Sequence, residues 1–251
     1  MTYESGWIPR NYDEDPVGSC AAAYSGERVS MDDWPDLIDY QSRNVCSAWH
    51  VHKYNRVPVL NQGRFKYCWA YAVIAGVMNR YAFQGLNNPV DELSATAVAA
   101  QGKNYRNVGG HCSQAIAYAE KYGIPEAKYW PNNSKDKSYA RDDEVKRSAK
   151  ETNVVEYEDC GDDFVAAISA MLTTNLPVAF AIPRWRHAVL AHRLYCKNPQ
   201  RPKSLGNYRS DFGNSYGNKA GQTGSGHIVG VPRLGKGHDR PKYEKVEQEK
   251  K

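Results

Sequence analysis

Four stretches of the chain carry apolar residues at helical spacing. The longest covers residues 68–84 and continues without a proline, which predicts an α-helix. Two more helices are predicted near 94–101 and 112–122. A fourth begins after Asp162 and Asp163, whose charges suit the positive end of a helix dipole. Its apolar residues are Phe164, Val165, Ile168, Met171 and Leu172.

Apolar runs of strand length dominate the later part of the chain. The predicted strands cover residues 177–182, 187–195, 208–212 and 227–231. Helices first and strands later predict an α+β fold, with one domain over residues 34–234. Within it we expect a helical half, residues 34–131, and a half built on an antiparallel, barrel-like sheet, residues 132–234.

The two ends of the chain lack such patterns. Residues 1–33 are polar and irregular, with several prolines and glycines, and this composition predicts an extended arm. Residues 235–251 are rich in charged residues. We expect them to form a tail that is disordered alone or ordered by a partner.

Composition excludes several classes of function. The 251 residues can bury a large core, and 41% of them are hydrophobic. No window approaches the roughly 18 apolar residues of a membrane helix, and no basic patch with an apolar run marks a secretory signal. The net charge of +5 is spread over both signs and is too small to imply nucleic acid. We therefore expect a soluble protein with no membrane or nucleic-acid partner.

Six cysteines invite a disulfide or metal interpretation. They are Cys20, Cys46, Cys68, Cys112, Cys160 and Cys196. Their spacing is irregular and no export signal is apparent, so we expect reduced thiols. Cys46 with His50 and His52, and the pair His111 and Cys112, lack the paired spacing of a structural zinc site. No metal and no cofactor are predicted.

The segment from Gln62 to Ala70 carries the strongest chemical signal. Cys68 opens the predicted helix, where unpaired backbone N–H groups and the dipole favour a thiolate. Gln62 lies across a glycine turn and can direct its side-chain amide to an oxyanion, together with the Cys68 N–H. A buried structural thiol is the alternative for an isolated cysteine.

A nucleophilic cysteine needs a base and a group that orients the base. Further along the chain, His187 follows a short turn and opens the predicted strand 187–195.

Together these segments resemble the papain-like cysteine proteases. In that family's signature a glutamine stands six positions before Cys-Trp-Ala, as Gln62 does here. His187-Ala-Val and Asn214-Ser-Tyr-Gly resemble the family's His and Asn segments, in the family's order. The resemblance implies that His187 is the base and that Asn214 orients it, with Asn207 and Asn218 as alternatives to Asn214. The resemblance covers about residues 34–234. It implies a papain-like, two-lobed fold with the active-site cleft between a helical lobe and a sheet lobe.

The resemblance also implies substrate-binding residues. Gly109 and Gly110 stand where the family binds an extended substrate backbone, and a residue without Cβ allows that close approach. Trp69, Trp185 and Tyr216 are assigned to the same cleft. Tyr216 replaces a tryptophan that shields the Asn–His hydrogen bond from water in the family.

Two departures from the family concern a disulfide and activation. Phe65 stands where many secreted members have a cysteine, and no cysteine stands near Arg106 or Asn107, where its partner would be. The arm, residues 1–33, is shorter and poorer in helix signals than the family's inhibitory propeptides. Zymogen control of the usual kind is therefore not expected.

The resemblance implies a thiol peptidase that cleaves peptide or isopeptide bonds in a protein or peptide substrate. A looser resemblance to short papain-like proteins of tailed bacteriophages runs through Trp34–Leu37, Leu93–Gly110 and Trp185–Val189. It implies, as the alternative, a structural or binding component of a virion with little turnover. Residues 1–33 and 235–251 would then dock to other virion proteins, in the virion or the host cytoplasm.

Overall fold

The computed structural model describes residues 6–19, 21–85, 90–152, 157–215 and 225–229. Its helices are α1 (Trp34–Arg43), α2 (Ala48–Tyr54), α3 (Cys68–Gln84), α4 (Ala95–Gly102), α5 (Cys112–Tyr122), α6 (Asp143–Glu151) and α7 (Phe164–Thr174). Its strands are β1 (Ala22–Ala23), β2 (Glu158–Asp159), β3 (Val178–Ile182), β4 (His187–Cys196), β5 (Tyr208–Gly213) and β6 (Ser225–Val229). The predicted α+β class is confirmed. The four predicted helices are α3, α4, α5 and α7, and the predicted strands are β3 to β6.

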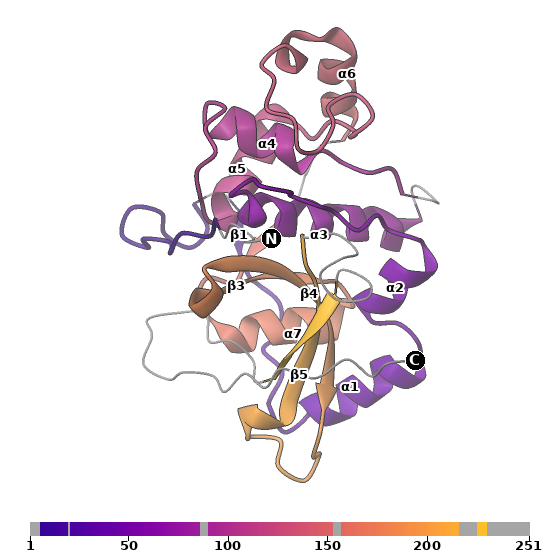
Figure 1. Ribbon diagram of the computed structural model, residues 1–251. Coiled ribbons are helices and arrows are strands. Elements are labelled where there is room, and N and C mark those ends of the chain that lie inside the picture. Colours follow the sequence, from indigo (N-terminus) through magenta and orange to yellow (C-terminus); the bar gives the residue numbers. More distant parts are fainter. Residues whose placement is uncertain (1–5, 20, 86–89, 153–156, 216–224, 230–251) are drawn as a thin grey trace.

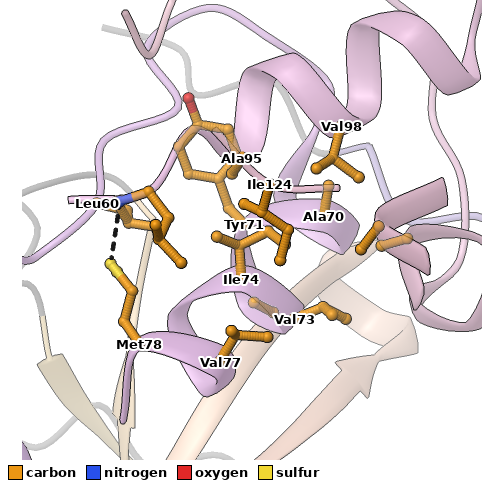
Figure 2. Packing of buried hydrophobic residues seen from close by; sticks show 14 of the residues in the cluster. Leu60, Ala70, Tyr71, Val73, Ile74, Val77, Met78, Ala95, Val98 and Ile124 are labelled. Atoms are coloured by element: carbon orange, nitrogen blue, oxygen red, sulfur yellow. Dashed lines mark hydrogen bonds between the residues drawn. The ribbon is translucent and has the colours of Figure 1, made fainter. Parts of the chain in front are cut away.

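Helix α3 is the centre of one core and has Cys68 as its first residue. Helices α2, α4 and α5 and strand β4 all pack against α3 (Figure 1). Figure 2 shows part of this core, to which Tyr71 of α3, Val98 of α4 and Ile124 contribute buried side chains. Burying such a side chain contributes about 1.5–3 kcal/mol. The helix ends at Gly85, whose left-handed φ of 66° suits a residue without Cβ.

The main sheet is antiparallel, with the strand order β3-β4-β5-β6. A 3-10 turn over Pro183–Trp185 joins β3 to β4, and Ile182 pairs with His187 in the hairpin. Ala188 of β4 belongs to the core of α3, whereas Val189 belongs to a second core that contains residues of α1 and α7. Among the described residues the sheet is open, with β3 and β6 at its edges, so it is not the closed barrel that the description barrel-like suggests.

Helix α1 packs on the sheet side of the molecule, although it lies within residues 34–131, the range predicted for the helical half. Trp34 donates its Nε1–H to the Val29 carbonyl (3.1 Å). Its ring makes edge contacts with Phe164 of α7 and Tyr208 of β5. The first helix is therefore fixed by one tryptophan that fills the second core. No described helix combines the length and apolar character that crossing a bilayer requires.

Two histidine rings stack where α2 meets β4. The rings of His52 and His192 lie 4.9 Å apart, with 27° between their planes. Nδ1 of His52 and both ring nitrogens of His192 are buried and have no hydrogen-bond partner among the described residues. Burial lowers the pKa of both imidazoles. For His192 the neighbouring His52 also disfavours a positive charge.

This histidine pair predicts acid sensitivity of the fold. Both folded-state pKa values lie below the usual 6.5, so between that value and the lower one only the unfolded chain gains protons, and stability falls with pH. We expect the free energy of unfolding to drop by about 1 kcal/mol for His192 between pH 6.5 and 5.5. Urea denaturation of a His192→Phe variant should show a smaller drop. An identical drop in both proteins would contradict this account.

Candidate active site

Cys68 stands at the start of α3 and is fully buried, with 0% of its surface exposed. The chain reaches it through a turn at Gly63, whose φ of 57° is left-handed. The next residue, Trp69, donates its Nε1–H to the Lys66 carbonyl (3.0 Å) and so closes the turn in front of the helix. The thiol therefore sits on a fixed helix end.

His187 and Asn214, which are far apart in sequence, meet at the end of the sheet. Nε2 of His187 lies 2.9 Å from Oδ1 of Asn214. Because an amide oxygen only accepts, Nε2 carries the proton in this pair and Nδ1 is left as the basic atom. Asn207 instead donates to the carbonyls of Asn198 and Arg201. Asn218, the other alternative, lies outside the described residues.

Gln62 is fully buried and joins the two halves of the molecule. Its backbone N–H donates to the Ser215 carbonyl (2.6 Å), and the Ser215 hydroxyl donates to Gln62 Oε1. These contacts turn the amide nitrogen away from Ser215, and Nε2 donates to the Phe65 carbonyl (2.6 Å). The structure thus fixes which end of the amide bears the N–H groups that an oxyanion would need.

Burial dominates the acid–base behaviour of both Cys68 and His187. It raises the pKa of the Cys68 thiol, and the backbone N–H groups of Ala188, Gly6, Trp69 and Trp7 offset this only in part. It also lowers the pKa of His187, against the hydrogen bond that His187 donates to Asn214. Both shifts favour the neutral forms, whereas the position of Cys68 on the helix had led us to expect a thiolate. Loss of water from the site explains the difference.

The water is excluded by residues 6–8 of the chain itself, which we call the cover segment. Trp7 forms a parallel bridge with Gly110. Gly110 N–H donates to the Gly6 carbonyl, and Ile8 N–H donates to the Gly110 carbonyl (both 2.9 Å). On the other side Trp7 N–H donates to the Arg186 carbonyl (2.9 Å), next to His187. The cover segment therefore spans from the helical side to the sheet side across the thiol.

The fit of the cover segment requires two glycines. A Cβ on Gly6 would lie 2.0 Å from the Lys66 carbonyl oxygen, and a Cβ on Gly109 would lie 2.3 Å from the Gly6 oxygen. Both obstacles are backbone atoms, which cannot rotate away. The segment presents N–H groups to the thiol, while the Gly6 carbonyl is bonded to Gly110. The carbonyl of Gly6 is consequently not positioned for attack by the Cys68 sulfur.

An ionic cluster holds the following residues of the arm. Arg10 pairs with Asp15 (2.9 Å) and with Asp159 of β2 (2.7 Å). Asp15 also accepts a hydrogen bond from Ser113 of α5 (2.7 Å) and lies 3.5 Å from His111. Arg10 has only a tenth of its side-chain surface exposed, so solvent screens this ion pair less than it screens a surface ion pair. The arm is thus fastened to both sides of the molecule.

A cavity of about 1100 Å³ adjoins the cover segment. Arm residues such as Trp7 and Arg10 form one wall, and the second half of α3, strand β3 and Cys112 form others. Each of the five described cysteines is free. No cluster of three or more His, Cys, Asp or Glu side chains suited to a metal occurs in the described part of the chain.

The remaining residues assigned to substrate binding differ in where they lie and what they contact. Gly109 and Gly110 do contact an extended backbone, which is that of the cover segment. Trp69 is fully buried, whereas Trp185 is 38% exposed and packs on Phe212. Tyr216 lies outside the described residues. The roles of the cover segment and of Ser215 were missed, since three residues in an irregular stretch and a serine beside Asn214 do not by themselves indicate these contacts.

Comparisons with known proteins identify the fold and the family. The sequence profile of the "Papain family cysteine protease" matches residues 46–203. Among solved structures, digestive procathepsin L 3 of Tenebrio molitor is similar with a TM-score of 0.56 and 22% identity, over 71% of this chain and 63% of that one. Xylellain, a cysteine protease from Xylella fastidiosa, is similar with a TM-score of 0.55 and 16% identity, over 89% and 88%.

The chain spans 63% of the length of that procathepsin. The proform of the ragweed pollen allergen Amb a 11 has a TM-score of 0.51 and 18% identity, over 73% of this chain and 60% of that one. Curated proteins give no match of comparable significance. At these identities the structures establish the papain-like fold, and the profile, which covers more than half of the sequence, establishes the family. The chain belongs to the papain family of cysteine proteases.

Proposed function

We propose that this protein is a cysteine peptidase whose nucleophile is Cys68, with His187 as base, Asn214 as its orienting residue and Gln62 as an oxyanion donor. The observation that carries the proposal is the 2.9 Å contact between His187 Nε2 and Asn214 Oδ1. It fixes the tautomer that leaves Nδ1 basic. The N–H of Ala188, the next residue, acts on the Cys68 thiol, so base and nucleophile belong to one site.

The reaction proceeds in two stages. His187 Nδ1 takes the thiol proton, and the sulfur attacks a peptide or isopeptide carbonyl while the Cys68 N–H and Gln62 Nε2 stabilise the oxyanion. The imidazolium then gives its proton to the leaving amine as the C–N bond breaks. Water attacks the resulting thioester with the same imidazole as base. This releases the carboxylic acid and restores the thiol.

In the proposed enzyme the cover segment must leave before a substrate binds. It occupies the Gly110 backbone groups and the space over the thiol. Water that enters once the segment leaves would lower the pKa of Cys68 and raise that of His187. The ion pair expected for an active thiol would then form in the open state.

Labelling with an epoxide that traps papain-like enzymes tests the proposal. The test uses a Gly6→Ala chain, in which the added Cβ displaces the cover segment. Peptide mapping by mass spectrometry should place the label on Cys68 of this chain, at a rate well above that of free cysteine. Adding Cys68→Ser should abolish the label, whereas adding Cys196→Ser, which changes a half-buried free thiol outside the site, should leave it unchanged. Labelling of the Gly6→Ala chain no faster than free cysteine at every pH between 5 and 9 would refute the assignment.

A further inference from the structure

Residues 64–67 lead directly into Cys68, and three hydrogen bonds tie them to residues 106–107. Lys66 N–H donates to Oδ1 of Asn107 (2.7 Å). Nδ2 of Asn107 donates to the Arg64 carbonyl (3.2 Å). The Tyr67 hydroxyl donates to the Arg106 carbonyl (2.8 Å). We call this group of contacts the Asn107 clamp.

The clamp stands where the sequence lacks a disulfide. Phe65 and the region of Asn107 are the two places at which the resemblance would put its cysteines, and both have other residues. One amide side chain contacts the segment on both sides of Phe65, as donor and as acceptor. Two hydrogen bonds of about 1 kcal/mol each can thus hold the loop without a covalent link.

Both donors of the proposed oxyanion hole depend on this segment. Tyr67 precedes α3 and makes no side-chain cap bond with it, so the direction of the Cys68 N–H is set by the path of residues 64–67. Gln62 Nε2 bonds to the Phe65 carbonyl, and Phe65 N–H bonds to the Gln62 carbonyl (3.0 Å). A shift of the loop would therefore move the nucleophile and both donors together.

We infer that Asn107 is a positioning residue for Cys68 and its oxyanion hole. It touches neither substrate nor reacting atoms, and it acts by holding the loop in register with the start of α3. The inference rests on the proposed peptidase function. It predicts that loss of the Asn107 amide impairs the chemical step more than substrate binding, because misplaced donors act mainly in the transition state.

Asn107→Ala in the full chain tests the inference. We expect kcat for a small peptide amide to fall on the order of tenfold to a hundredfold, with KM within about threefold. The pH profile of Cys68 alkylation by iodoacetamide should shift to higher pH, because a displaced thiol is stabilised less as a thiolate by the N-terminus of α3. Asn107→Asp keeps the acceptor for Lys66 and loses the donor to Arg64, so its effect should be smaller.

Asn132→Ala is the matched control. Asn132 also accepts from a backbone N–H, that of Thr96, and donates to a backbone carbonyl, that of Leu93. Both variants should lose similar thermal stability, but only Asn107→Ala should change kcat and the alkylation profile. Equal profiles and equal kcat in the two variants would overturn the inference. If Cys68 of the Gly6→Ala chain fails to label with the epoxide, the proposed function fails instead, and the alkylation profile still tests the clamp.

Discussion

A Gly6→Ala variant is expected to alkylate at Cys68 at least about tenfold faster than the wild-type chain at pH 7. The added Cβ would lie 2.0 Å from the Lys66 carbonyl oxygen, so the cover segment cannot keep its place. Its three backbone hydrogen bonds to Gly110 and Arg186 are worth about 1 kcal/mol each. Their loss is enough to move the open population on the order of a hundredfold.

The rate of iodoacetamide labelling, followed by mass spectrometry of the Cys68 peptide, measures this effect. Gly206→Ala is the matched control, because a Cβ at Gly206 meets no atom within 4 Å. Thermal melting separates release of the segment from general unfolding: Gly6→Ala should leave the main transition in place. An unchanged labelling rate in a folded Gly6→Ala protein would show that the segment does not shield the thiol.

Replacing His187 with alanine in the Gly6→Ala chain is expected to reduce peptide hydrolysis by about 10³-fold or more. The loss removes both the base that activates Cys68 and the acid that protonates the leaving amine. The measurement is kcat/KM for a small peptide amide at pH 7. Thiol alkylation should fall mainly at acidic and neutral pH, since above the thiol pKa no base is needed.

Two comparisons make the His187 result specific. His50→Ala removes another buried histidine, one that contacts Ser47 in α2, and should leave hydrolysis nearly unchanged in the folded protein. Asn214→Ala should lower activity, whereas Asn207→Ala should not, because Asn207 bonds to the carbonyls of Asn198 and Arg201. Full hydrolysis by a folded His187→Ala protein would eliminate this histidine as the base.

The sequence predicted the features of the site that depend on residues close together along the chain. The spacing of Gln62 and Cys68 predicted a turn before a helix, and both residues stand there. The meeting of His187 with Asn214 followed from the order of the family's segments. The Asn-Ser-Tyr-Gly segment favoured Asn214 over Asn207, and the described contacts agree.

The sequence could not predict the features that depend on backbone contacts or on how an element packs against its neighbours. The cover segment is held by N–H and carbonyl groups that every residue has, so Gly6 and Gly109 are its only trace. Helix α6 was missed because only Val145, Ser148 and Ala149 of its residues are buried. Docking of residues 1–33 and 235–251 to virion proteins stays a prediction, and residues 6–8 are already engaged within the chain.

Because the cover segment belongs to the same polypeptide, its local concentration near Cys68 does not change when the protein is diluted. A short tether typically provides an effective concentration on the order of millimolar. Dilution therefore cannot release the cover segment and activate the proposed peptidase. An incoming peptide must compete with the cover segment for the Gly110 backbone. The apparent KM therefore rises in proportion to the ratio of closed to open molecules, whereas kcat is unaltered. A peptide that pairs with Gly110 more tightly than the tether allows would act as substrate and activator at once.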